Sequence, residues 1–341
     1  MTPRRSLFAA LAAALLFCGL VPAPASAQTV TVKLGTMAPD GSAWHSLIKQ
    51  LGEEWGKASG GKVKLKVYAG GVAGNEGDMV RKLRIGQLNA AAISVVGLHD
   101  IETSNQCIAT PGLIEDQAEF DAVFERSIPS FEKRLLEKGF VVLNWGDTGT
   151  VHMFFNKEIK GLADMKGVKM FTWAGDPTAS KAWEAVGFQP VVISSTDILP
   201  SLQTGMIQAF ATAPIMAFTA RWYENAKWMV SGTWGHLPGA TIVSKEVWEK
   251  IPAELRPQLL TISRDIGGKV NKEVLRMQAE SIEQMKKNGL KVVDIPASEK
   301  AGWTQMAEKL WPVVRGGICT EAAFDEIKKI RDEYRAAKGK K

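Results

Sequence analysis

Polar and apolar residues alternate in two short segments near the start of the chain, and a helical pattern separates them. Residues 29–34 and 62–68 alternate with a period of two, as half-buried strands do. Between them, apolar residues recur every three or four positions after Ser42, a residue type that favours a helix N-cap. A helix over 78–85 and a buried strand over 88–96 are predicted next. Strands that alternate with helices predict a parallel sheet covered on both faces.

A second set of strands and helices follows a helical stretch over residues 111–139. Strand patterns at 140–146 and 151–156 lead into further strands and helices. From about residue 253 to 288 the helical pattern is almost unbroken, with Pro257 in the first turn, where proline is tolerated. Two α/β units and a long helix that braces both predict two lobes. The cleft between them is a preferred place for a ligand site.

The first 27 residues have the three parts of a secretory signal peptide. Arg4 and Arg5 form the basic region, and residues 7–20 form an apolar core of about 14 residues, short of the ~20 that cross a bilayer. Residues 25–27 (Ala-Ser-Ala) form an A-x-A cleavage site. We therefore expect residues 1–27 to be removed and the remainder to be exported as a soluble protein. An uncleaved anchor is the alternative.

Composition limits the possible partners but does not decide whether the two remaining cysteines form a disulfide. Removal of the leader takes away two arginines and no acidic residue, so the formal charge falls from +6 to +4, too mild to indicate a nucleic-acid partner. A hydrophobic content of 45% is sufficient for a sizeable core. The mature chain keeps Cys107 and Cys319. In an oxidising compartment these form either one long-range disulfide or two unpaired thiols, and the sequence does not decide between them.

The sequence contains none of the common catalytic motifs. The four histidines are scattered and do not have the spacing of a metal site. The glycine-rich stretch lacks the lysine and the spacing of a phosphate-binding loop, and no G-x-S-x-G elbow is present. We therefore expect a protein without catalytic activity, metal or cofactor.

Four stretches resemble the DctP family, the solute-binding proteins of TRAP (tripartite ATP-independent periplasmic) transporters. YAGGVAGNEGDMVRKLRIGQLNAAAIS, at residues 68–94, resembles the glycine-rich turn, helix and small-residue strand of the family. GLADMKGVKM (161–170), EAVGFQPVVISSTDILPSLQTGMIQAF (184–210) and GHLPGATIVSKEVWEKIPAELRPQLL (235–260) resemble its later segments, in the right order. The resemblance covers nearly the whole mature chain.

The resemblance implies a two-lobed periplasmic-binding-protein fold of type II, the Venus flytrap. Each lobe would be a mixed sheet flanked by helices, with a long helix bracing both. Lobe I would comprise residues 28–149 and about 239–270, and lobe II residues 150–238 and about 271–341. The protein would capture a small molecule in the periplasm and deliver it to the small and large subunits of a membrane permease. It would need no cofactor and would be a monomer or a dimer.

The chain departs from the family at three ligand-facing segments. In most members an arginine in a K-x-R stretch binds the ligand carboxylate; here the stretch is Lys169-Met170-Phe171. A second arginine of many relatives corresponds to Val151. A later polar segment reads QAFATAP, at 208–214. A buried cation without an anion is costly, so a cleft for apolar ligands should lose its arginines. We therefore expect a hydrophobic or amphipathic ligand.

The predicted ligand-binding residues come from these segments and from lobe I. They are Phe171, Trp173, Val151, Met153, Phe210, Thr212, Pro214, Trp44 and Gly97. Any of them can instead belong to the core of its lobe, and Trp183 is more typical of core. Lys169 and Arg221 are the nearby cations that could still meet a polar head group, although both more typically point to solvent.

Three other functions stay open at this point. The receptor could bind an organic acid whose carboxylate is held by backbone amides or by a displaced cation. The protein could be a cargo-handling or interaction protein of the cell envelope that does not deliver to a permease. An enzyme is the third, in which distant residues converge in the fold.

Overall fold

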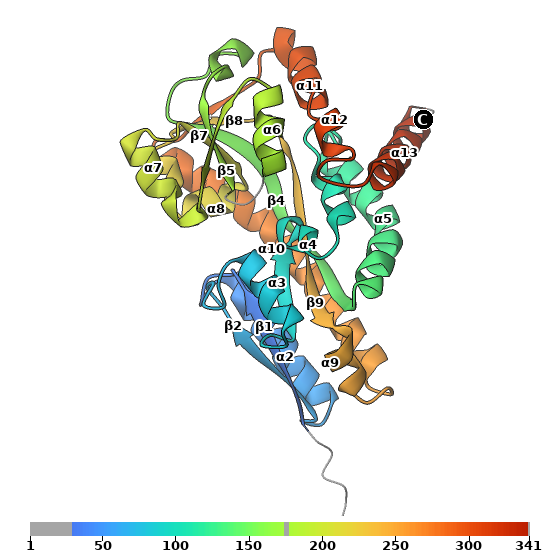
Figure 1. The fold of residues 1–341 in the computed structure, drawn as a ribbon. Helices are drawn as coiled ribbons and strands as arrows, with labels where there is room; N and C mark the ends of the chain where they lie inside the picture. The colour runs from blue at the N-terminus through green and yellow to red at the C-terminus, as the bar shows by residue number, and fades with distance from the viewer. Residues whose placement is uncertain (1–28, 174–176, 340–341) are drawn as a thin grey trace, which may run out of the picture.

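The computed structural model describes residues 29–173 and 177–339, so the predicted signal peptide lies outside the described residues. The chain forms two lobes (Figure 1). The sheet of lobe I has the order β2-β1-β3-β9-β4. Its strands are β1 (Val30–Thr36), β2 (Val63–Tyr68), β3 (Ala90–Ser94), β9 (Gly235–Ser244) and the first part of β4 (Phe140–Phe155). The first three are parallel to each other, whereas β9 is antiparallel to both β3 and β4.

The sheet of lobe II continues from the second part of β4. The order is β4-β7-β5-β6, and the lobe also holds the pair β8 and β10 beside β4. The bounds are β7 (Ala209–Thr212), β5 (Lys169–Trp173), β6 (Gln189–Ile193), β8 (Trp228–Val230) and β10 (Lys291–Val293). Strands β5, β6 and β7 are parallel, and β7 is antiparallel to β4. Each lobe is therefore a mixed sheet, as the family resemblance implies. The parallel sheet predicted from the alternation of strands and helices holds for β1, β2 and β3 but not for β9 and β4, which are antiparallel.

Helices cover both faces of each sheet. The α-helices are α2 (Ala43–Ala58), α3 (Glu76–Arg84), α4 (Val95–His99), α5 (Gln117–Glu137), α6 (Pro177–Ala185), α7 (Ile198–Thr204), α8 (Pro214–Thr219), α9 (Lys245–Lys250), α10 (Arg256–Lys287), α11 (Lys300–Glu308), α12 (Trp311–Val314) and α13 (Glu321–Lys338). The 3-10 helices are η1 (Thr103–Ala109), η2 (Leu162–Met165), η3 (Ser195–Asp197), η4 (Trp222–Glu224) and η5 (Ala297–Glu299). The cap expected at Ser42 is confirmed: its side chain accepts the His45 N–H at 3.1 Å.

Strand β4 connects the two lobes without a break. The sequence pattern predicts separate strands at 140–146 and 151–156, and the break between them is wrong. The glycines at 146 and 149 resemble a turn, but β9 pairs with β4 on both sides of them. Strand β9 supplies the hydrogen bonds, so β4 continues through residues 147–150 as a bulged strand.

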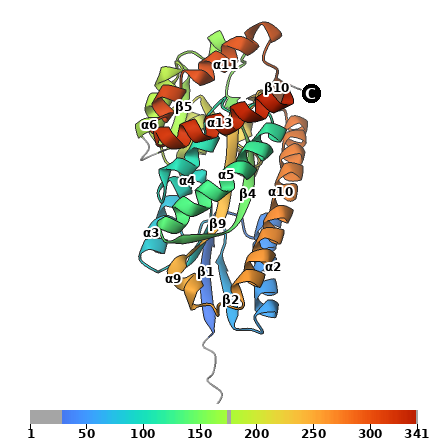
Figure 2. The same ribbon diagram turned by 90° about the vertical axis from the view of Figure 1, so that its right-hand side faces the viewer.

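The long helix α10 braces both lobes. It packs against α2 of lobe I, along β4, and against α8 of lobe II (Figures 1 and 2). The observed helix starts three residues after the predicted start, and Pro257 lies in its first turn as expected. This helix and the two strands that cross between the lobes, β4 and β9, form the connection between the lobes.

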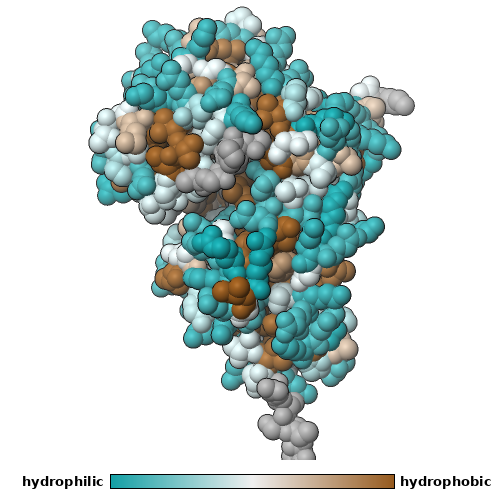
Figure 3. Space-filling model, in the orientation of Figure 1, coloured by the Kyte–Doolittle hydropathy of each residue, from teal (hydrophilic) through white to brown (hydrophobic). Residues whose placement is uncertain are grey.

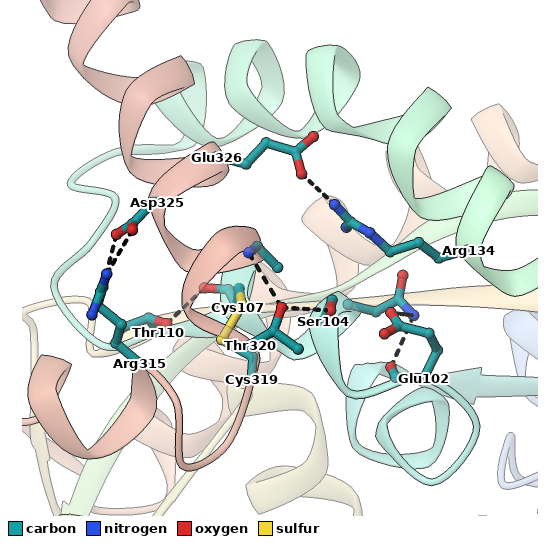
Figure 4. The surroundings of a disulfide bond; sticks show 12 residues. Glu102, Ser104, Cys107, Thr110, Arg134, Arg315, Cys319, Thr320, Asp325 and Glu326 are labelled. Atoms are coloured by element: carbon teal, nitrogen blue, oxygen red, sulfur yellow. Dashed lines mark hydrogen bonds and ion pairs between the residues drawn. A yellow bond between two sulfur atoms is a disulfide. The ribbon is translucent and has the colours of Figure 1, made fainter.

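The C-terminal segment joins the two lobes on their outer side. Helix α12 packs against α6 of lobe II, whereas α13 packs against α5, which lies along the lobe I part of β4. The Cys107–Cys319 disulfide, which the sequence left open, fixes this segment to η1 (Figure 4). Beside it, the Ser104 and Thr320 hydroxyls lie 3.2 Å apart, and Arg134 of α5 pairs with Glu326 of α13. The C-terminal helices therefore act as a clamp held by one covalent bond and several polar contacts.

Candidate functional site

The parallel strands of both lobes end at the gap between them. Strand β4 runs from lobe I into lobe II, and the antiparallel pairings then fix every other direction. Strands β1, β2 and β3 run toward lobe II, and β5, β6 and β7 run toward lobe I. The surface is hollowed between the lobes at this level (Figure 3). Ligands of open α/β sheets bind outside the carboxyl ends of the strands, so this gap is the candidate site.

Exposed apolar side chains lie beside these strand ends in both lobes. In lobe I, Met37 follows β1 directly and Val72 lies in the turn after β2; they are 41% and 74% exposed. In lobe II, Trp173 ends β5 and Met216 lies on α8, just after β7; they are 44% and 37% exposed. We call these four residues the apolar rim. Brown, hydrophobic surface borders the hollow on the upper lobe in Figure 3.

The two predicted aromatic residues of β5 lie at different depths. Trp173 belongs to the apolar rim, whereas Phe171 is only 5% exposed and packs in the core of lobe II with Phe154 and Phe210. Both side chains lie on the same face of β5, and their rings meet edge to face with centroids 5.2 Å apart. Buried Phe171 thus packs against the exposed Trp173 ring. Its direct contact with a ligand stays a prediction.

The predicted residues of β4 and β7 divide between the two faces of the sheet. Met153 and Phe210 are completely buried, in different core clusters. Val151 is half-buried, and its carbonyl accepts the Trp234 N–H at 2.8 Å. Thr212, the last residue of β7, is half-buried and pairs with His152 of β4. Val151 and Thr212 are therefore nearer to the gap than Met153 and Phe210.

Three further predicted ligand-binding residues lie in the first turns of helices, and Trp183 lies within α6. Pro214 is the first residue of α8 and is buried. Trp44 is the second residue of α2 and is half-buried. Gly97 is buried in α4, where an added Cβ would lie 2.8 Å from a Glu76 oxygen. Trp183 stacks on Trp234 with centroids 5.5 Å apart, which is the core position expected for it.

Glu76 is an acidic residue of the lobe I strand ends that the sequence analysis did not single out. Its carboxylate accepts the Ser94 N–H (2.9 Å), the Ser94 hydroxyl (2.7 Å) and the Gly97 N–H (2.8 Å). Burial raises the pKa of this carboxyl, and the hydrogen bonds from Ser94 and Gly97 oppose the rise. The same contacts explain why residues 95–96, predicted as strand, form the first turn of α4: Ser94 caps it and Glu76 binds its N–H groups.

Two cations near these strand ends, Arg221 and Lys82, are bound to other protein groups. Arg221 pairs with Glu224 at 2.8 Å. The Lys82 ammonium donates to the Ala73 carbonyl at 2.7 Å, next to Val72. Lys169 is the first residue of β5, at the opposite end from Trp173. Among the described residues, no group of three or more His, Cys, Asp or Glu side chains is placed to hold a metal ion.

Sequence reasoning missed Met37, Val72 and Met216 of the apolar rim. The signal that could have found them is their position, since each follows the carboxyl end of a predicted parallel strand. Apolar type alone does not separate them from core residues. Their exposure depends on the turns that follow the strands: the Gly70 and Gly71 N–H groups, for example, donate to the Ala38 and Thr36 carbonyls and fold the Val72 turn beside Met37.

The chain matches the model of the bacterial extracellular solute-binding proteins, family 7 (DctP), over residues 34–315. It is 25% identical over 322 residues to the C4-dicarboxylate-binding periplasmic protein DctP of Rhodobacter capsulatus, covering 90% of this chain and 92% of that protein. It is 22% identical over 320 residues to the 2,3-diketo-L-gulonate-binding periplasmic protein YiaO of Escherichia coli, covering 92% and 97%.

Solved structures agree in fold. A TRAP periplasmic solute-binding protein of Pseudomonas putida with bound D-glucuronate has a TM-score of 0.80 at 20% identity, covering 89% of this chain and 96% of that one. One from Desulfovibrio salexigens with bound orotic acid has a TM-score of 0.81 at 17% identity, covering 90% and 99%. The fold is thus the two-lobed type II binding-protein fold.

The chain belongs to the family 7 (DctP) solute-binding proteins and is a solute receptor of the TRAP type. The family role is binding rather than catalysis, and it places the protein in the periplasm. Within the residues that the structure describes, no helix is both long and apolar enough to cross a membrane.

Proposed function

We propose that this receptor captures a hydrophobic or amphipathic small molecule between its lobes and delivers it to the small and large subunits of a TRAP permease. The observation that carries the proposal is the apolar rim. Met37 and Val72 are exposed beside lobe I strands that run toward lobe II, and Trp173 and Met216 are exposed beside lobe II strands that run toward lobe I. A ligand that touches both pairs would favour the closed arrangement of the lobes.

The energetics of apolar burial agree with this ligand class. Each Å² of apolar surface removed from water contributes about 25 cal/mol. A ligand that covers Trp173 and Met216 and is itself apolar buries surface on both partners. Burial of a few hundred Å² therefore matches the free energy that a relative gains from a salt bridge to a carboxylate, without a cation.

An organic acid is the second candidate ligand. It is favoured by the structures that this chain resembles, which contain D-glucuronate and orotic acid. In this chain its carboxylate would be held by backbone N–H groups or by a cation displaced from its present partner, such as Arg221 from Glu224. The two candidates predict different retained ligands.

Native mass spectrometry of the protein purified from its own host is the direct test. We expect an adduct that dissociates to a fatty acid or another largely apolar molecule, because such a ligand is held by the apolar rim through purification. A short dicarboxylate or a uronate as the released ligand would contradict the hydrophobic assignment and support the acid. The receptor role itself would stand in either case.

Substitution of Trp173 tests the rim in solution. We expect Trp173→Ala to weaken the binding of palmitate about 10- to 100-fold, because a large apolar contact worth roughly 1.5–3 kcal/mol is lost. The measurement is isothermal titration calorimetry with sodium palmitate below its critical micelle concentration. The matched control is Ile85→Ala: Ile85 is 67% exposed and follows the C-terminal end of α3. Equal affinities of the Trp173→Ala protein and the unsubstituted protein would rule out contact between Trp173 and palmitate.

A further inference from the structure

The crossing of β4 between the lobes contains a bulge that two side chains of α10 hold. Between Asp147 and Thr150 the register against β9 shifts, since three steps along β4 match two steps along β9, from Pro238 to His236. The bulge therefore inserts one extra residue at the point where the strand leaves lobe I. Its backbone N–H groups cannot all pair with β9 and need other acceptors.

Side-chain acceptors satisfy these N–H groups. The Asp147 N–H donates to the Asn271 side-chain oxygen at 2.8 Å, and the Gly149 N–H donates to the Asp147 carboxylate at 2.8 Å. The Thr150 N–H donates to the Gln278 side-chain oxygen at 2.9 Å. The Gln278 amide nitrogen donates in turn to the Thr150 hydroxyl. Helix α10 thus binds both ends of the bulge, through amides two helical turns apart on one face.

The packing around Gly149 brings a third element to the same point. Gly149 has a φ of +106°, and a Cβ there would overlap the Gln278 side-chain oxygen and lie 3.5 Å from the Ala213 Cβ. Ala213 is the residue before α8. The Gln278 amide therefore lies where the bulge of β4 meets the connection from β7 to α8. Both of these segments lead directly into predicted ligand-binding residues, Val151 on one side and Pro214 on the other.

We propose that Asn271 and Gln278 are positioning residues for solute binding. By holding the bulge against α10, the two amides fix the direction in which β4 enters lobe II. They therefore fix where Val151 and the start of α8 stand relative to the solute. The inference rests on the proposed function in one respect: these segments are taken to face the solute. Neither amide needs to contact the solute itself.

Hydrogen exchange of the ligand-free protein tests whether Asn271 and Gln278 hold the bulge of β4, without reference to any ligand. In Gln278→Ala we expect exchange of the Thr150 amide to be about three- to tenfold faster, because the acceptor of that N–H is lost. Gln278→Glu keeps an oxygen acceptor and should restore slow exchange. The matched control is Gln284→Ala, the same residue type on the same helix, exposed and six positions away. In Asn271→Ala, the faster amide should be that of Asp147.

Palmitate titration then tests positioning. We expect Gln278→Ala to bind palmitate about tenfold more weakly than the unsubstituted protein, with Gln278→Glu close to the unsubstituted value and Gln284→Ala unchanged. A purely structural role would lower the denaturation midpoint of Gln278→Ala without changing the affinity of its folded fraction, and that result would overturn the proposal. Unchanged exchange at Thr150 would overturn it as well. If Gln278→Ala does not fold, Asn271→Ala and Gln278→Glu are compared with the unsubstituted protein in the same way.

Failure of the proposed function appears separately, as absent palmitate binding in the unsubstituted protein.

Discussion

Replacing both disulfide cysteines, as in Cys107→Ala/Cys319→Ala, should lower the free energy of unfolding by about 3–5 kcal/mol. The bond links residues 212 positions apart in sequence. A crosslink that closes so long a loop greatly restricts the unfolded chain, and this restriction is the main source of its stabilising effect. Urea denaturation followed by far-ultraviolet circular dichroism measures the loss as a lower midpoint.

A reductant supplies the control for the disulfide. The unsubstituted protein in excess phosphine reductant should fall to the midpoint of the double variant, and the double variant should not respond to reductant. Helix α13 should be affected first, because without the bond only noncovalent contacts hold it to α5 and η1. These are the packing of buried Phe324 and Ile327 and polar contacts such as the bidentate pair of Arg335 with buried Glu119. Equal midpoints for the oxidised, reduced and substituted proteins would show that the clamp needs no covalent bond.

Acidification should destabilise the protein through His236, at a cost of about 3 kcal/mol between pH 6.5 and pH 4. Burial lowers the pKa of this imidazole from its ordinary 6.5 to about 4. Its ring stacks on Phe120 with centroids 4.4 Å apart, and neither ring nitrogen has a hydrogen-bond partner in the described part of the chain. The unfolded chain takes up the proton first, so this contribution is complete above pH 6.5 and is lost as the pH falls through 4.

The variant His236→Phe isolates this contribution. It keeps the stacking on Phe120 and removes the titrating group, so its stability should fall less between pH 7.5 and pH 4.5. At pH 7.5 we expect it to equal or exceed the unsubstituted protein, because a buried polar ring without partners is lost. Thermal unfolding at several pH values measures both slopes. Burial also lowers the pKa of His152, which stays in both proteins. Parallel slopes for the two proteins would contradict the assignment to His236.

Local patterns predicted those elements whose formation depends on nearby residues. The cap at Ser42 and the proline in the first turn of α10 act within a few residues, and both are confirmed. The family motifs predicted the two-lobed fold correctly. The interpretation of 140–146 and 151–156 as separate strands was wrong because β9 decides it, and β9 lies about 90 residues further along the chain.

The depth of the candidate site residues could not be predicted from the sequence. Alternation places Phe171 and Trp173 on one face of β5, as observed, but it does not say that one is core and the other rim. That difference arises because Phe154 and Phe210, from two other strands, cover Phe171 and leave Trp173 at the strand end. The same limit explains why Met37 and Met216 were missed.

The sequence alone determined the α/β class, the helix cap at Ser42 and the family. These features depend on the order of residues and on contacts within a few positions. Only the tertiary structure decided that Cys107 pairs with Cys319, that β4 crosses between the lobes as one bulged strand held by α10, and which apolar residues beside the strand ends are exposed. Each of these depends on segments far apart in sequence meeting in space, and no local pattern encodes that distance.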